Sequence, residues 1–278
     1  MISRYPELSN YLDVDTGAAT ATEGHHGMPH FVPYETAIGV GKVTGHSKFR
    51  GYGERLTCST SVTGDDIWNG VATTIPLPDQ TTGEQMTLVS TSIQDDSAGT
   101  GVRTIDVHYV DIAGDEQHEI IALDGTTPVS TVAADIRFVQ AIHGESWGTG
   151  LVAAGDIVIY RFGDATRVYN KISAGVNVSL STARMVPAGK TAYIKNVSCS
   201  GASNKSMSIR LRITSTHEDT LITDYAYQIK DSFFLQNSGS VKDFACPLKA
   251  PALSVIKMTA WSIQAGGDVA GNWGGWHE

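Results

Sequence analysis

Residues 86–129 read MTLVSTSIQDDSAGTGVRTIDVHYVDIAGDEQHEIIALDGTTPV, and this stretch decides the fold class. Between residues 102 and 110, apolar and polar side chains alternate. Ile105, Val107 and Tyr109 fall on one face of an extended chain, and Thr104, Asp106 and His108 fall on the other. A period of two is typical of a half-buried β-strand. The run DDSAG at 95–99 and the pair DG at 124–125 are turn signals. The stretch therefore predicts short strands joined by tight turns.

The same pattern extends along most of the chain. Further strands are expected at residues 136–142, 156–162, 191–198, 206–214 and 254–263. The one helical turn expected is at residues 131–135. Strands at this spacing, with turn residues between them, indicate an all-β protein built from sandwich or jelly-roll domains. We expect two in tandem, at residues 51–165 and 166–278.

Residues 1–50 are predicted to form an extended N-terminal arm. The run TGAATATEGHHGMPHF is small and polar, and Pro6, Pro29 and Pro33 interrupt regular structure. With so few apolar anchors, such a segment orders only when something holds it. We expect a neighbouring subunit to do so, and an arm folded over its own domain is the alternative.

Composition excludes several classes of function. The 278-residue chain carries a net charge of −9, which disfavours nucleic acid and anionic membranes as partners. No signal peptide and no membrane-spanning run of apolar residues is recognised. Cys58, Cys199 and Cys246 lie far apart and are expected to be buried free thiols.

Short motifs give no support for catalysis. GESWG at 144–148 matches the serine nucleophile elbow, but a glycine-rich loop and a strand follow it where a helix is required. Gly189-Lys190-Thr191 lacks both the first glycine and the helix of a phosphate-binding loop. The pairs at residues 65–66 and 95–96 are acidic turn residues. We predict no enzyme, no catalytic residue and no cofactor.

Binding residues are expected at the two ends of the chain. The histidines near residue 30 match no standard metal pattern, so no metal ligand is assigned. Two tryptophans close the chain among glycines, and exposed tryptophans anchor partners. The expected interface residues are His25, His26, His30, Phe31, Tyr34, Trp273 and Trp276.

Five motifs resemble, in order, a family of virion structural proteins from tailed bacteriophages. They are GDDIWNG (64–70), DDSAGTGVRT (95–104), LDGTTPV (123–129), AAGDIVI (153–159) and VPAGKTAYI (186–194). The likeness covers residues 64–195, with weaker support towards the C-terminus. It implies a β-rich, virion-associated protein without known catalytic residues.

A capsid-associated decoration or cement protein is the first functional expectation. Such a protein would assemble in the host cytoplasm, would bind the major capsid protein or other virion proteins, and would form a homo-oligomer, with a trimer favoured. A tail component is the alternative, as a connector-proximal ring, a fibre base or an adhesin. An enzyme acting on envelope polymer ranks last, because no acid, base or nucleophile converges in the sequence.

Overall fold

The computed structural model describes residues 11–13, 31–201, 205–214, 227–236, 239–264 and 266–278. Within them the chain is nearly all β, as the alternation predicted. The elements are β1 (Tyr11–Asp13), β2 (Phe31–Pro33), α1 (Tyr34–Gly39), β3 (Ser47–Cys58), β4 (Asp65–Asp66), β5 (Met86–Ser90), β6 (Val102–Asp111), β7 (Glu116–Ala122), β8 (Val129–Ser130), β9 (Ile136–Trp147), β10 (Ile157–Arg161), β11 (Asp164–Ile172), β12 (Arg184–Met185), β13 (Ala192–Gly201), β14 (Ser206–Thr214), β15 (Tyr227–Gln236), β16 (Gly239–Ala250), β17 (Val255–Ser262) and β18 (Gly267–His277).

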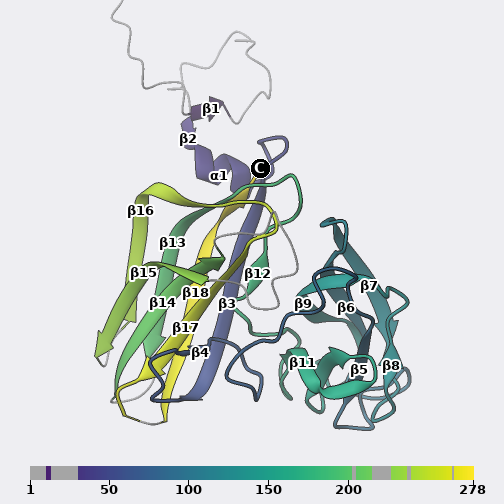
Figure 1. The fold of residues 1–278 in the computed structure, drawn as a ribbon. Coiled ribbons are helices and arrows are strands. Elements are labelled where there is room, and N and C mark those ends of the chain that lie inside the picture. The colour runs from purple at the N-terminus through teal and green to yellow at the C-terminus, as the bar shows by residue number, and fades with distance from the viewer. Residues whose placement is uncertain (1–10, 14–30, 202–204, 215–226, 237–238, 265) are drawn as a thin grey trace, which may run out of the picture.

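Two antiparallel sheets form what we call the larger sandwich (Figure 1). One sheet has the order β16-β13-β18-β3, and the other has the order β12-β17-β14-β15 with β4 beside β17. Alternation in β14 turns Ile209 and Leu211 into the shared core, as expected. The two inner faces bury one continuous apolar cluster, which is what holds a sandwich together.

Two further sheets form the smaller sandwich, on the right in Figure 1. Their orders are β7-β6-β9 and β11-β10-β5-β8. The predicted inner face of β6 is confirmed, because Ile105, Val107 and Tyr109 are buried in the core between these sheets. The polar positions of β6 therefore face away from that core.

Strand pairing departs from the expected domain boundaries at 50/51 and 165/166. Strand β3 pairs with β18 along most of its length, so residues 47–58 belong with the C-terminal strands. The smaller sandwich is thus an insertion between β4 and β12 of the larger one. Local patterns could not reveal this, because the partner of β3 lies more than 200 residues away in the sequence.

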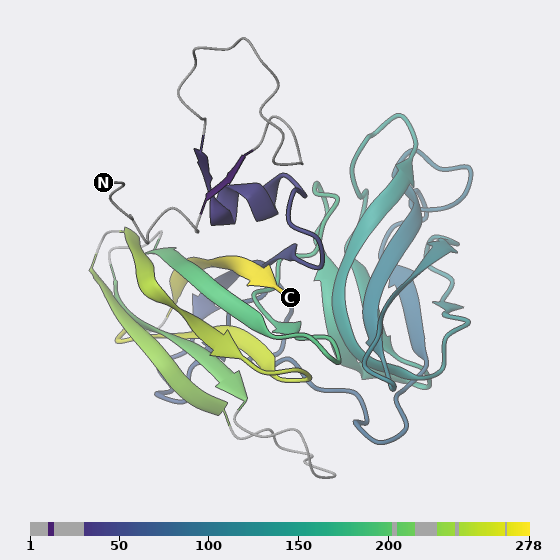
Figure 2. The ribbon, with the colours of Figure 1, turned by 90° about the horizontal axis from the view of Figure 1, so that it is seen from above.

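A separate apolar cluster lies where the two sandwiches meet. It combines side chains of β6 and β9 with side chains of β12 and β17: Val110, Phe138, Met185 and Val255, together with Trp68, Ile75 and Ala183. Figure 2 shows the two sandwiches side by side. Burial of this cluster favours a fixed arrangement of the two units.

Part of the expected arm belongs to the fold. Strands β1 and β2 pair with each other, and α1 buries Ala37 and Ile38. Residues 47–50 already lie in β3. The arm expectation is therefore wrong for residues 34–50, while residues 1–10 and 14–30 lie outside the described residues. The helical turn expected at 131–135 is also absent, and α1 is the helix that the described part of the chain contains.

A tryptophan of the glycine-rich strand β18 lies directly over a glycine of the neighbouring strand β3. Trp273 of β18 is the direct cross-strand partner of Gly51 on β3. A Cβ at Gly51 would lie 2.5 Å from Trp273 Nε1 and 2.4 Å from the Thr182 carbonyl oxygen. Glycine is therefore required at residue 51, where an aromatic side chain lies directly over the backbone.

Among the described residues, no helix has the length and apolar character needed to cross a bilayer.

Candidate functional site

Three histidines converge on one carboxylate on the outer face of the sheet β7-β6-β9. Asp106 and His108 are two residues apart on β6 and so share a face. His118 on β7 is the cross-strand partner of His108, and His143 on β9 is the cross-strand partner of Asp106. Register alone therefore brings the four side chains together.

The distances are those of direct polar contact. His108 Nε2 lies 3.1 Å from Asp106 Oδ2, and His143 Nε2 lies 3.6 Å from the same oxygen. His118 Nδ1 lies 3.2 Å from the other oxygen, Oδ1. The ring of His108 stacks on those of His143 and His118, with centroids 4.9 and 5.7 Å apart. The Asp106 side chain is only 10% exposed, whereas the three imidazoles remain accessible to solvent.

Electrostatics favour the neutral form of the central imidazole. Burial lowers the pKa of His108 below its usual value, Asp106 opposes this, and His143 adds to the lowering. A neutral imidazole keeps a nitrogen lone pair available as a ligand or an acceptor. Ligand atoms of Asp106, His108 and His143 all lie within 4.8 Å of one another. The alternation in the sequence predicted Asp106 and His108 on one polar face but not the cluster, because His118 and His143 join it only through strand register.

A pocket of about 350 Å³ lies beside the cluster, between the two sandwiches. His108 and His118 line it from the smaller sandwich, and Lys48, Arg50 and Arg184 line it from the larger one. The pocket is therefore predominantly basic, in a chain whose net charge is negative.

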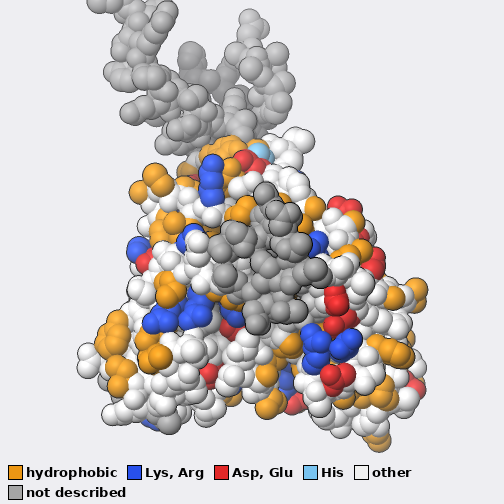
Figure 3. All heavy atoms as spheres, in the orientation of Figure 1, with side chains coloured by type: hydrophobic (Ala, Val, Ile, Leu, Met, Phe, Trp, Pro, Cys, Tyr) orange, Lys and Arg blue, Asp and Glu red, His pale blue; other side chains and the backbone are white. Residues whose placement is uncertain are grey.

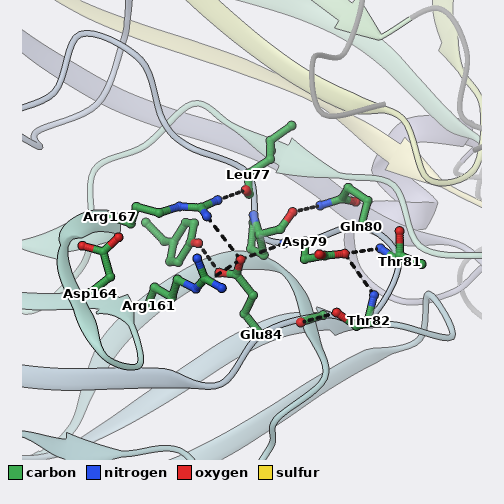
Figure 4. Close-up of polar contacts among 12 residues, drawn as sticks. Leu77, Asp79, Gln80, Thr81, Thr82, Glu84, Arg161, Asp164 and Arg167 are labelled. Atoms are coloured by element: carbon green, nitrogen blue, oxygen red, sulfur yellow. Dashed lines mark hydrogen bonds and ion pairs between the residues drawn. The ribbon is translucent and has the colours of Figure 1, made fainter. Parts of the chain in front are cut away.

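A second polar centre surrounds Glu84 (Figure 4). Its buried carboxylate accepts hydrogen bonds from the Tyr169 hydroxyl and, at 3.1 Å, from the backbone N–H of Asp79. Arg161 and Arg167 lie 3.6 and 3.4 Å away. Burial and the Glu84 carboxylate raise the pKa of Tyr169. All partners belong to this chain, so Glu84 anchors the segment before β5 onto the smaller sandwich.

The structure describes only some of the expected interface residues. His25, His26 and His30 lie outside the described residues, and only the backbone of Phe31, in β2, is described. Tyr34 is partly exposed, and its hydroxyl forms a hydrogen bond with His46 Nε2.

The prediction that Trp273 is an interface residue is wrong. Its ring is fully buried in the core of the larger sandwich, and its indole N–H donates to the Thr182 carbonyl at 2.7 Å. Trp276 is also largely buried, stacked on Tyr193 with Tyr34 edge-on to it. Neither tryptophan is an exposed anchor, because β18 is a central strand flanked by β13 and β3.

Strands β15 and β16 are the outermost strands at one edge of the larger sandwich, and the sequence did not predict them. Each of β15 and β16 pairs on one side only among the described strands. Phe234 is 63% exposed and Val241 is 74% exposed. Figure 3 shows hydrophobic side chains over this edge, at the left of the view. Charged side chains lie between them. Cys246 of β16 is exposed, contrary to the expectation that all three thiols are buried.

Residues of the rejected catalytic motifs make contacts that support the fold. Ser146 lies within β9 and its Oγ contacts Thr104 Oγ1 at 2.6 Å, so no strand-to-helix elbow forms. Asp95 is fully buried and accepts hydrogen bonds from Ser90 and from three backbone N–H groups. Asp66 forms a buried ion pair with Lys257. These carboxylates stabilise the fold.

Comparisons with known proteins give only weak similarities. No family description and no curated protein matches the chain. The structure of infectious bursal disease virus Gt strain aligns with a TM-score of 0.21 at 8% identity, over 84% of this chain and 71% of that one. The VP2 subviral particle of infectious bursal disease virus aligns with a TM-score of 0.15 at 10% identity, over 84% and 75%. Both are viral structures, and both similarities are too weak to define a shared fold.

Proposed function

We propose that this protein is a structural component of a tailed-phage virion, and specifically a decoration or cement protein on the capsid. The five ordered motifs at residues 64–195 support a virion role, and the all-β fold agrees with it. Its partners would be the major capsid protein or other virion proteins. The acidic net charge suits contacts with protein surfaces better than contacts with nucleic acid.

The free edge of β15 is the observation that carries this proposal. Its ten residues pair with β14 on one side, and no other described strand pairs with the second side. Pro247 interrupts β16, whereas β15 contains no proline and has charged residues only at Lys230 and Asp231, where its pairing with β14 shifts register. An unpaired edge is a template for a strand from another chain, and natural proteins normally protect edges this long.

Addition of strands at this edge would join each molecule to its neighbours. Exposed Phe234 on β15 and Val241 on β16 provide apolar contacts beside it. A closed trimer is the arrangement we favour, since closed rings satisfy every copy of an interface. A ring in the tail would use the same edge, and the number of copies per particle separates the two locations.

Two measurements test the proposal. Mass spectrometry of purified particles should find hundreds of copies for a shell protein; six to a few dozen copies would place it in the tail, and absence from particles would refute a virion role. Hydrogen exchange in residues 227–236 should slow when the protein is bound to particles, because new backbone hydrogen bonds protect amides. Unchanged exchange there would refute the edge as the contact.

A matched pair of variants sharpens the second test. Phe234→Lys should weaken attachment to particles, because it places a charge beside the docking edge. Val132→Lys is the control, since Val132 is even more accessible than Phe234 but lies in the smaller sandwich, away from β15. Equal attachment of the two variants would contradict the proposed interface.

A further inference from the structure

We propose that Asp106, His108 and His143 bind one divalent transition-metal ion of the zinc class, with His118 positioning the carboxylate. This site lies in the smaller sandwich and does not depend on the proposed virion role. Its ligands come from β6 and β9, two neighbouring strands that pair with each other along the length of β6. A rigid sheet is therefore the scaffold for the ligands.

The ligand types select the ion. Imidazole nitrogen and carboxylate oxygen together suit Zn²⁺ and neighbouring first-row ions, whereas Mg²⁺ and Ca²⁺ prefer oxygen ligands only. Two imidazoles and one carboxylate supply three ligands and leave one position for water. The set provides one negative charge from Asp106, which partly balances the charge of a divalent cation.

The spacing fits a single ion. Tetrahedral ligands about 2.0–2.1 Å from zinc lie about 3.3 Å from each other. The distances from Asp106 Oδ2 to the Nε2 atoms of His108 and His143 are 3.1 and 3.6 Å. Both nitrogens therefore already lie near the required distance from this oxygen, and all three ligand atoms lie within 4.8 Å of one another. The two imidazoles are partly exposed, so small ring rotations can bring them into final position.

Hydrogen bonding alone is a poorer account of the arrangement. Two imidazole nitrogens approach the same carboxylate oxygen while their rings stack 4.9 Å apart. A carboxylate oxygen can accept two N–H groups, but the 3.6 Å from His143 Nε2 to Asp106 Oδ2 is too long for a hydrogen bond. If both rings were charged instead, the stacked cations would repel each other. One cation between the nitrogens and the oxygen would accept a lone pair from each of these three atoms.

His118 has a different role from His108 and His143. Its Nδ1 contacts Oδ1, the carboxylate oxygen that His108 and His143 do not use. An imidazole N–H donated to that oxygen fixes the carboxylate so that Oδ2 faces the ion, as outer partners of metal ligands do. His118 is therefore a positioning residue.

Isothermal titration of the metal-free, untagged full chain with ZnCl₂ tests the site. We expect one ion per chain. His143→Ala and His108→Ala should abolish that binding, and His118→Ala should weaken it about 10- to 100-fold. Titration with MgCl₂ should give no heat of binding. Absence of a one-to-one zinc complex in the native chain would overturn the proposal.

Control variants separate this site from other histidines. The triple variant His25→Ala, His26→Ala, His30→Ala should bind zinc like the native chain, and so should His46→Ala. Loss of the one-to-one complex in either control, with binding retained in His143→Ala, would overturn the assignment. Circular dichroism confirms that each variant is folded; the side chains of His108 and His143 are solvent-accessible, so their replacement should leave the sheet intact.

Cobalt provides a second, spectroscopic readout. Co²⁺ bound by two imidazoles and a carboxylate should show the intense visible absorption of a four-coordinate ion, and Zn²⁺ should displace it. Retention of that spectrum in the double variant His108→Ala, His143→Ala would refute the ligand assignment.

Discussion

Replacing Trp273 with alanine should severely destabilise the larger sandwich. The ring is fully buried, covers Gly51 across the sheet and donates a hydrogen bond to the Thr182 carbonyl. Truncating a buried tryptophan costs about 3–5 kcal/mol in free energy of unfolding. The orphaned Thr182 carbonyl adds about 1 kcal/mol or more if water cannot reach it. We therefore expect a loss of about 4–6 kcal/mol, comparable to the whole stability of a weakly stable protein.

A second substitution separates packing from hydrogen bonding. Trp273→Phe keeps an aromatic ring over Gly51 but removes the indole N–H, so it should cost less than Trp273→Ala. Equal losses in the two variants would show that the hydrogen bond, and not the covering ring, dominates at this position.

Urea unfolding followed by far-ultraviolet circular dichroism measures these losses, as shifts of the transition midpoint at unchanged slope. The matched control is Trp147→Ala, because Trp147 is 43% exposed at the end of β9 and should cost much less. A loss below about 1 kcal/mol for Trp273→Ala, or a loss equal to that of the control, would refute the packing argument for β18.

Three further predictions concern single groups. A thiol reagent should label Cys246 quickly and Cys58 slowly in the folded chain, because Cys246 is exposed whereas burial raises the pKa of Cys58 to about 12; rapid labelling of both would contradict the described core. Asp66→Asn should cost about 3–5 kcal/mol in urea unfolding, since it leaves Lys257 charged and buried without its partner; the double variant with Lys257→Met should recover much of that loss. Burial lowers the pKa of His277, so the unfolded chain takes up a proton below about pH 6.5 while the folded chain resists it, and stability should fall as pH drops through that range. The drop in urea midpoint between pH 7.5 and 5.5 should be smaller in His277→Gln, and an unchanged drop would exclude His277 as a source.

The sequence predicted the strands whose side chains alternate. β14 matches its expected range, and β6 extends only one residue beyond it, because apolar side chains alternate with polar ones along both strands. Strands β15 and β18 escaped prediction for opposite reasons. β15 is mostly exposed and so carries a weak apolar pattern, whereas β18 is rich in glycine and is stabilised by aromatic rings that lie across its neighbours.

The candidate metal site shows the same division. The spacing of Asp106 and His108 was enough to place both on one polar face of β6. Only strand register decided that His118 and His143 lie beside them. Which strand pairs with which, and where the smaller sandwich is inserted, also depended on contacts between residues far apart in the chain. A local pattern determines which way each side chain points, whereas burial of the complete core determines which side chains meet.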